Sequence, residues 1–240
     1  TSREAEDVNG NIQLVFKQRF AITVNLVGVN MDNEESVPSI KINGVETLEI
    51  KVWKDVALSE VTIQYASSNA KSGNLFLGFF INDLAVGSDD IRTIALAVAS
   101  LSGDVVIEAR FQKLSLAWQS QTYNASVFRS AVDLSVIQES YREHLDAVID
   151  YEPLNEDGPG VVVEGGEKGV MHVGTYKVIY TIYYYPTVGD KSVRYPVGNG
   201  VSYIEITPAT LYFENLTIKN KIYDSTTSAE VYEGGSSYYL

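Results

Sequence analysis

The sequence predicts an all-β chain made of tandem β-sandwich domains. Apolar and polar residues alternate over many short stretches, as at Val61, Ile63 and Tyr65, and this period of two is typical of strands with one buried face. Tyrosine, which favours strands, occurs sixteen times in 240 residues. Self-comparison also finds a weak repeat at an offset of 100 residues, about the length of one sandwich domain.

The first long alternating stretch runs from residue 12 to residue 29. We expect it to form the first strand or two of the N-terminal domain. An alternative is a strand donated to a neighbouring subunit, because an extended segment can add to the sheet edge of another chain. The apolar positions of this stretch are Ile12, Leu14 and Phe16, followed by Phe20, Ile22, Val24 and Leu26.

Further strands follow in the first half of the chain. Asn43 and Gly44, a pair that strongly favours a tight hairpin turn, separate residues 40–42 from residues 45–47. The continuous apolar run 75–81 is typical of a central strand buried on both faces. The remaining strands expected here lie at residues 48–52, 61–65 and 104–110.

Two stretches fit a helix or a strand equally well. Residues 91–101 are rich in alanine, and residues 132–149 carry apolar side chains at nearly helical spacing. Short apolar patterns of this kind do not separate the two structures. The apolar residues of the second stretch are Leu134, Ile137, Tyr141, Leu145 and Val148.

The composition changes near residues 111–114. Alanine, leucine and phenylalanine are frequent before this point, whereas tyrosine, valine, threonine, glycine and proline become more frequent after it. We therefore expect an N-terminal β-rich domain of residues 1–112, a module of residues 113–210, and the opening strands of a further, incomplete repeat at residues 211–240.

The repeat aligns residues 116–126 with residues 216–226. Each copy is interpreted as a strand that leads into a turn, at Asn124 in the first copy and at Asp224 in the second. Asn and Asp favour turns because their side chains accept hydrogen bonds from the backbone two residues on.

A tyrosine corner is predicted after Gly174. In immunoglobulin sandwiches a tyrosine begins the penultimate strand two residues before a core position, and Tyr176 stands in this relation to Val178. These features favour immunoglobulin-like β-sandwich domains. Alternation places on one face Tyr176, Val178, Tyr180, Ile182 and Tyr184.

The sequence also resembles a known family. Residues 221–229 are similar to the Lys-x-Tyr-Asp-Gly-Thr-Thr-x-Ala signature that opens the YDG/MBG-type immunoglobulin-like repeats of bacterial surface adhesins, and residues 173–182 and 203–211 resemble the closing pattern. The resemblance covers residues 114–240. Ser225 departs from the usual Gly, and the first copy reads Tyr-Asn-Ala-Ser at the corresponding place. The resemblance implies tandem β-sandwich modules in a long surface protein, without catalytic residues.

Charge and composition exclude several classes of function. The formal net charge of −13 is unfavourable next to phosphate backbones, so no nucleic-acid partner is expected. The chain has no cysteine, which excludes disulfides, cysteine zinc sites and thiol catalysis. No run of about 18 apolar residues occurs, so no membrane insertion is expected in this segment.

We assign no catalytic, cofactor-binding or metal-binding residue. The nucleophile elbow, the P-loop, the complete dinucleotide motif and the zinc-protease motif do not occur. His144 and His172 have no partner motif and are interpreted as ordinary strand or surface residues. Acidic residues at 32–35, 89–90 and 155–157 are interpreted as solvated loops, although oxygen ligands in loops can bind Ca²⁺.

Three weaker signals concern modification and binding. Alternation places Tyr184 in the core and Tyr183 and Tyr185 outside, which would give a sugar or protein ligand a shelf of two rings; packing against a neighbouring module explains them equally well. Asn124 and Asn215 begin glycosylation sequons. An isopeptide bond, which some adhesin sandwiches use in place of disulfides, remains a hypothesis without a named triad.

We therefore expect a non-catalytic structural or adhesive module of an extracellular cell-surface protein. The expected partners are neighbouring modules of the same protein, and a protein or glycan of a host or cell surface. Two alternatives remain open. The long N-terminal strand and the unmatched C-terminal strands would also suit a subunit of an extracellular filament assembled by strand exchange, and the chain could be the binding module of a secreted carbohydrate-active enzyme.

Overall fold

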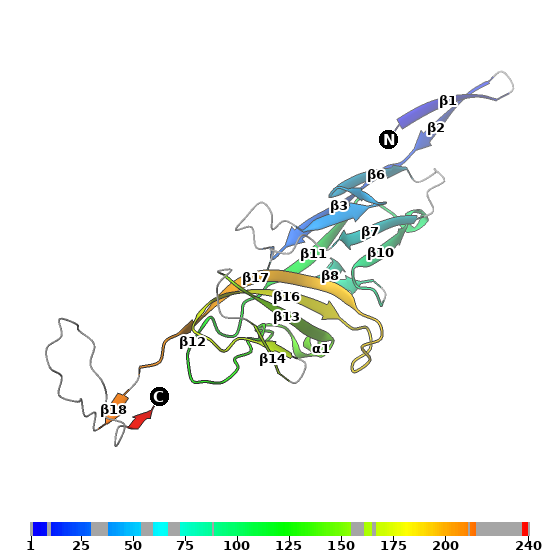
Figure 1. Cartoon of the computed structure of the whole chain (residues 1–240). Coiled ribbons are helices and arrows are strands. Elements are labelled where there is room, and N and C mark those ends of the chain that lie inside the picture. Colours follow the sequence, from blue (N-terminus) through cyan, green and yellow to red (C-terminus); the bar gives the residue numbers. More distant parts are fainter. Residues whose placement is uncertain are drawn as a thin grey trace, which may run out of the picture.

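The computed structural model describes most of the chain and confirms that it is mostly β-sheet (Figure 1). Among the described residues, α-helix is confined to one short segment, α1 (Glu139–Arg142). The described residues are 2–8, 11–29, 38–53, 60–66, 73–87, 89–154, 161–164, 167–210, 212–214 and 237–239.

A nine-stranded mixed sheet runs through both halves of the chain. Its neighbours are antiparallel, except that β11 runs parallel to β3 and the short β12 (Ser120–Thr122) runs parallel to β17. The short β9 (Leu84–Val86) pairs with β8. The order across the sheet is β13 (Leu145–Pro153), β16 (Gly174–Tyr184), β17 (Tyr195–Thr207), β8 (Asn74–Ile81), β11 (Val105–Lys113), β3 (Arg19–Val27) and β6 (Glu49–Trp53).

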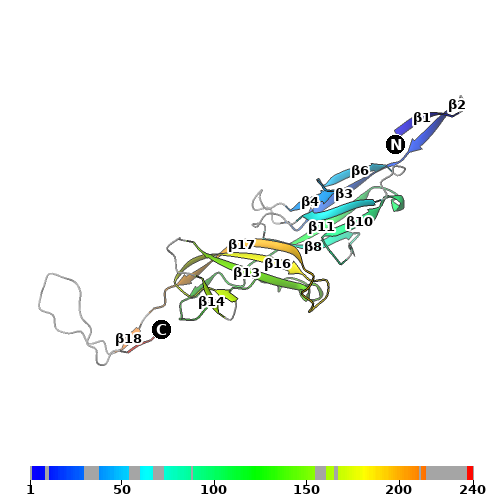
Figure 2. The same ribbon diagram turned by 45° about the vertical axis from the view of Figure 1, so that its right-hand side comes forward.

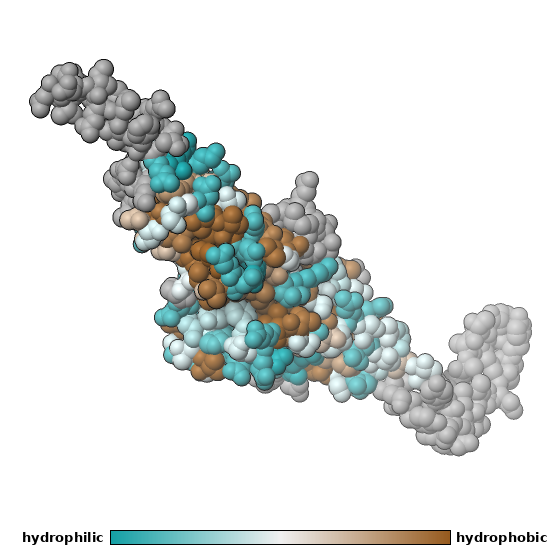
Figure 3. All heavy atoms as spheres, turned by 180° about the vertical axis from the view of Figure 1, so that it is seen from behind, coloured by the Kyte–Doolittle hydropathy of each residue, from teal (hydrophilic) through white to brown (hydrophobic). Residues whose placement is uncertain are grey.

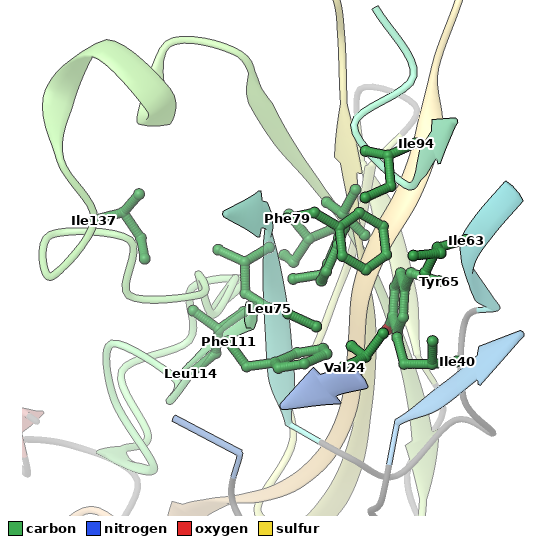
Figure 4. Close-up of a cluster of buried hydrophobic side chains, with 14 of the residues drawn as sticks. Val24, Ile40, Ile63, Tyr65, Leu75, Phe79, Ile94, Phe111, Leu114 and Ile137 are labelled. Atoms are coloured by element: carbon green, nitrogen blue, oxygen red, sulfur yellow. The ribbon is translucent and has the colours of Figure 1, made fainter. Parts of the chain in front are cut away.

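A four-stranded antiparallel sheet forms the second layer of the N-terminal half. Its order is β10 (Thr93–Ala97), β7 (Glu60–Ala66), β4 (Ser39–Ile42) and β5 (Val45–Glu46). Alternate residues of both layers point into one core, as their periodicity predicts. Figure 4 shows this packing, with the labelled side chains Val24, Ile40, Ile63, Tyr65, Phe79 and Ile94 lying close together.

Aromatic rings fill the middle of this core. Phe76 stacks on Tyr65 with ring centroids 4.5 Å apart, and it meets Phe79 edge to face at 5.1 Å. Phe111 of β11 lies 5.3 Å from Phe76. These contacts confirm that the apolar run 75–81 forms a central strand, because β8 has neighbours on both edges and is buried over most of its length.

The predicted hairpin is confirmed. Asn43 and Gly44 connect β4 to β5 with φ angles of 50° and 79°, the left-handed conformations that a tight two-residue turn requires. The neighbouring alternation at 48–52 is confirmed only in part. Val52 is buried and Ile50 half-buried, but Leu48 lies before β6 and is exposed.

Each of the two ambiguous stretches contains one strand and one short helical turn. Residues 91–101 contain β10 and the single 3-10 turn Val98–Ser100. Residues 132–149 contain α1 followed by the start of β13. In both cases long-range pairing decides the structure, because β10 pairs with β7 and β13 pairs with β16.

The N-terminal alternating stretch forms two strands. β2 (Asn11–Lys17) pairs with β1 (Ser2–Val8) in a hairpin, and β3 then enters the large sheet with Phe20, Ile22 and Val24 buried. Figures 1 and 2 both place this hairpin beyond the end of the N-terminal sheets.

In the C-terminal half, β13, β16 and β17 form one layer. Opposite them lie β14 (Val162–Glu164), β15 (Glu167–Gly169) and segments joined by the bridges Leu116–Val132 and Phe128–Val170. The predicted common face of β16 is confirmed: the first four of its alternating side chains are buried, and the last, Tyr184, is half-buried.

The remaining C-terminal strands, β18 (Tyr212–Glu214) and β19 (Ser237–Tyr239), pair with each other. The second copy of the repeat, with its turn at Asp224, lies outside the described residues. In the first copy Asn124 caps its turn as predicted, since its Oδ1 accepts a hydrogen bond from the N–H of Ser126 at 3.0 Å.

The two halves meet where β17 passes β8. Gly198 pairs with Leu75, and the Gly73 N–H donates to the Asn199 carbonyl at 2.9 Å. Tyr141 of α1 donates its hydroxyl to the Phe76 carbonyl at 2.9 Å. β11 ends at Lys113, next to the predicted domain boundary, but one sheet continues across it. The division of the chain into domains therefore stays a prediction.

Hydrophobic residues gather over the middle of the face shown in Figure 3, where hydrophilic residues interrupt them. Within the described parts of the chain, no helix is both long enough and apolar enough to span a lipid bilayer.

Candidate functional site: the aromatic cluster at the β16–β17 turn

Aromatic side chains gather where β16 ends and β17 begins. Tyr184 stacks on Tyr141 of α1, with centroids 5.5 Å apart, and on the imidazole of His144, at 5.2 Å. The strand pair brings Tyr195 opposite Tyr184, so the first residue of β17 joins the same region. Burial raises the pKa of Tyr184, with a smaller contribution from Asp89. The hydroxyl therefore stays protonated at neutral pH.

His144 has a structural position within this cluster. Its Nδ1 lies 2.6 Å from the Tyr185 carbonyl oxygen, and its own carbonyl accepts a hydrogen bond from the Tyr185 N–H at 2.8 Å. The backbone and the imidazole of His144 thus hold the end of β16 against the start of β13.

Three cations lie over tyrosine rings around the turn. The guanidinium of Arg194 is 4.3 Å from the Tyr183 centroid, and the ammonium of Lys191 is 5.7 Å from that of Tyr185. The ring quadrupole attracts a cation placed over its face. These contacts cover two of the three consecutive tyrosines.

Arg92 links the cluster to the N-terminal half. Its guanidinium lies 4.6 Å from the Tyr195 centroid and binds Asp90 through two parallel hydrogen bonds, Nε to Oδ1 at 2.9 Å and Nη2 to Oδ2 at 3.0 Å. Such a bidentate pair holds the guanidinium plane in a fixed orientation. Asp90 therefore positions Arg92 over the ring.

The predicted two-ring shelf is wrong. Tyr185 is only 5% exposed, because the turn that follows it folds over the strand end and places Lys191 on its ring. Tyr183 is half-buried beneath Arg194, so it offers a ring edge and a cation in place of a bare face. Tyr184 packs against the core, as expected.

A shallow hollow of about 260 Å³ lies beside the cluster, between the turn and the loop that carries Asp89. A hydrogen bond from the Ser192 N–H lowers the pKa of Asp190, which keeps its carboxylate ionised. One ring edge, acidic oxygens and backbone groups can bind hydroxyl-rich or cationic ligands weakly. The lining residues are Asp89, Pro186, Thr187, Asp190, Val193 and Tyr195.

The other predicted residues lie apart from this region. His172 contributes its carbonyl oxygen, which accepts the hydroxyl of Tyr176. Asn124 of the first sequon is exposed, and Asn215 of the second lies outside the described residues. The acidic groups at 32–35 and 155–157 also lie outside them. Within the described part of the chain, no three His, Cys, Asp or Glu residues form a group that could hold a metal ion.

Sequence reasoning missed Arg92 and Arg194. Both are isolated arginines in turn-rich segments, and their partners Tyr195 and Tyr183 are brought to them by strand pairing and by the return of the chain at the β16–β17 turn. No local pattern marks such contacts.

Comparison with protein-family models and with curated proteins finds no match to this chain. The resemblance to YDG/MBG-type repeats therefore rests on the residues of the sequence itself, and the function is argued from the structure.

Proposed function

We propose that this chain is a structural and adhesive segment of an extracellular cell-surface protein and that residues 113–210 form an immunoglobulin-like module within it. The observation that carries the proposal is a hydrogen bond at the start of β16. The Tyr176 hydroxyl donates to the His172 carbonyl four residues upstream, at 2.9 Å. A bond of this kind is typical of the tyrosine corner of immunoglobulin sandwiches, and it supports the proposed module.

The strand order around Tyr176 supports the same module. A tyrosine corner opens the penultimate strand, and β16 is followed by one further strand of the module, β17. Val178, two residues after the tyrosine, is fully buried at the core position. β12, near the start of the module, runs parallel to its last strand.

Parallel terminal strands suit a module that transmits force along a chain. When the two ends of residues 113–210 are pulled apart, β12 and β17 are drawn in opposite directions along their length. Their backbone hydrogen bonds are then loaded together instead of one after another. The Tyr123 N–H to Thr207 carbonyl bond and the Glu205 N–H to Gln119 carbonyl bond, both 2.8 Å, belong to this contact.

The resemblance of residues 114–240 to repeats of bacterial surface adhesins supports the surface location. A net charge of −13 favours solubility at an exposed surface. The partners proposed on this basis are neighbouring modules and a surface protein or glycan. We propose that such a ligand contacts Tyr183 and Arg194 and enters the hollow beside Asp190.

Force spectroscopy on the full chain, held at both termini, tests the structural part of the proposal. Thr122 and Thr207 are 85 residues apart, so rupture of the β12–β17 contact releases about 30 nm of chain at ~3.6 Å per residue. We expect a resolved force peak with this increment. Unfolding without any such peak would contradict a force-bearing module.

A matched pair of variants tests whether the force peak comes from the β12–β17 contact. Gln121→Pro removes a backbone N–H from the middle of β12 and should lower the rupture force, because proline cannot donate to a ladder. Gln119→Pro changes the same residue type just before the strand and leaves its carbonyl acceptor in place. The force should then remain closer to that of the unmodified chain.

A further inference from the structure

β13 is an edge strand of the nine-stranded sheet, and among the described residues β16 is the only strand that pairs with it. Two backbone hydrogen bonds fix its orientation: the Tyr185 N–H donates to the His144 carbonyl, and the Leu154 N–H donates to the Thr175 carbonyl. Both bonds involve even-numbered residues of this segment, and backbone groups alternate in direction along a strand. The N–H and carbonyl groups of the even-numbered residues therefore point toward β16.

The backbone groups of Leu145, Ala147 and Ile149 consequently point away from β16. Within the described part of the chain they have no strand partner. The N–H of Tyr151, the next residue of this parity, is already taken by Asp150 Oδ1 at 2.8 Å. The open part of the edge thus spans about five residues, which is enough for a short strand to pair.

A groove of about 680 Å³ lies along this edge. One wall is β13 from Leu145 to Tyr151, the other is the segment from Arg129 to Val132, and Glu167 and Lys168 close one end. Leu145, Ala147 and Ile149 share the core-facing parity with the buried Ile182 and Tyr180 but are themselves only half-buried. The core is therefore open at this edge.

The solvent face of β13 has a polar, apolar, polar pattern. Asp146 forms an ion pair with Lys191, and Asp150 accepts two hydrogen bonds from Lys168 at 2.6 and 2.7 Å. Between them Val148 is 49% exposed. Natural sheets protect exposed edges with prolines, bulges or charged side chains. The stretch from Leu145 to Ile149 has no proline, no bulge and no inward-pointing charge, and its one charged residue, Asp146, is paired with Lys191.

The hairpin β1–β2 has the complementary pattern. Ile12, Leu14 and Phe16 alternate with Gln13, Val15 and Lys17 in the sequence, which again puts one apolar residue between polar ones on the second face. One edge of β2 is taken by β1, and the other has no strand partner within the described parts of the chain. Figures 1 and 2 place the hairpin beyond the N-terminal sheets and far from β13.

We propose that the open edge of β13 accepts the β1–β2 hairpin of a second copy of this chain, with β2 paired to β13. The backbone groups of Leu145, Ala147 and Ile149 would bond to β2, as in other cases of β-strand addition. Apolar residues of β2 would cover the open core. The proposal goes beyond the surface-module function and does not depend on it.

The side chains match in either strand direction. An antiparallel pairing sets Phe16 opposite the small Ala147 and Leu14 opposite Ile149, whereas a parallel pairing exchanges these two partners. In both, Val15 lies opposite the exposed Val148. β1, which carries four charged residues in seven, then becomes the outermost strand and protects the new edge.

This contact joins different surfaces of the two copies. A head-to-tail contact of this kind continues from copy to copy and gives an open filament unless the rotation closes a ring. Such assembly agrees with the strand-exchange alternative predicted from the sequence.

Cysteine cross-linking tests the contact without background, because the chain has no cysteine. Chains with Val15→Cys and chains with Val148→Cys are mixed and oxidised. Directly opposed residues on neighbouring strands have Cβ atoms close enough for a disulfide. We expect the mixed dimer as the main product. The matched control replaces Val148→Cys by Val193→Cys, another half-exposed valine, and should give little mixed dimer.

Two outcomes would overturn the proposal. One is the absence of the mixed dimer at protein concentrations up to about 1 mM, the weak end of specific affinities. The other is a predominance of Val148→Cys homodimers, which would indicate that two β13 edges pair with each other.

Light scattering of single variants provides an independent test. Leu14→Asp places a charge on the proposed contact face and should weaken self-association roughly 10- to 100-fold, as loss of a buried leucine implies. Gln13→Asp introduces the same charge on the other face of β2 and should change association much less. Equal effects of the two variants would contradict the proposed pairing.

Ala147→Pro tests the acceptor side. Proline removes the outward N–H of residue 147, and an edge strand tolerates this where the N–H faces solvent. Association should fall at least 10-fold while circular dichroism stays unchanged. Undiminished association of this variant would refute the proposed backbone pairing.

Discussion

Gly198 of β17 lies directly against Leu75 of β8, so closely that a Cβ on residue 198 would come within 3.2 Å of the Leu75 Cα and 3.0 Å of the Asn74 carbonyl oxygen. Both are backbone atoms, which cannot move aside as a flexible side-chain end can. This close approach joins the two halves of the molecule into one sheet.

We expect Gly198→Ala to separate the strands at this junction. Overpacking of a tight site typically costs about 1–3 kcal/mol, and denaturant unfolding should report a loss of stability in this range. Gly103→Ala is the matched control, because a Cβ there would meet nothing within 4 Å. Equal stability of the two variants would show that β17 and β8 are not in tight contact.

The proposed tyrosine corner gives a second prediction. Tyr176→Phe keeps the buried ring and removes the hydrogen bond to the His172 carbonyl, so we expect a loss of about 0.5–1.5 kcal/mol in the free energy of unfolding. Tyr203→Phe removes a hydroxyl from the same sheet at a side chain that is 53% exposed, and it should change stability very little. Identical effects of both variants would argue against a specific role of the corner.

Arg92 and Tyr195 should be energetically coupled across the two halves. A double-mutant cycle with Arg92→Gln and Tyr195→Leu measures this coupling in thermal or denaturant unfolding. A cation–π contact of this partly exposed kind is worth about 0.5–1 kcal/mol. A coupling energy of zero would mean that the guanidinium and the ring do not interact in solution.

Acid should weaken the ion pair between Asp150 and Lys168, which lies at the closed end of the β13 groove. The hydrogen bonds from Lys168, and to a smaller degree the Tyr151 N–H, hold the pKa of Asp150 below its ordinary value. The stabilisation that this carboxylate provides is present above the ordinary aspartate pKa, near 3.9, and is lost as the pH falls through the lower folded-state pKa. Because the pair is half-exposed, the effect amounts to at most about 1 kcal/mol.

Thermal unfolding between pH 6 and pH 2.5 checks the sign. The unmodified chain should lose more stability below about pH 4 than Asp150→Asn, which keeps an oxygen acceptor for the Tyr151 N–H but has no charge to lose. An equal loss of stability in both proteins would show that Asp150 does not contribute to the destabilisation by acid.

The sequence predicts those strands whose buried face is visible in the order of apolar and polar residues. The buried parity of β7, the central position of β8 and the common face of β16 follow from alternation or from a continuous apolar run. The turn at Asn43 and Gly44 follows from their tolerance of positive φ. The all-β class can therefore be predicted from local sequence patterns.

Structural features that depend on contacts between residues far apart in the sequence cannot be predicted in this way. Residues 91–101 and 132–149 carry mixed patterns, and only pairing with β7 and β16 makes part of each stretch a strand. The continuation of one sheet from β17 to β8 rests on a single close approach at Gly198. The burial of Tyr185 depends on how the turn after β16 folds back, so the alternation rule fails there.

Surface exposure in the cells that make the protein is the central claim of this account. Antibodies raised against the folded chain should label intact, unpermeabilised cells, and brief protease treatment of those cells should remove the label. Labelling that requires permeabilisation and survives the protease would place the chain inside the cell and contradict its role as a surface module.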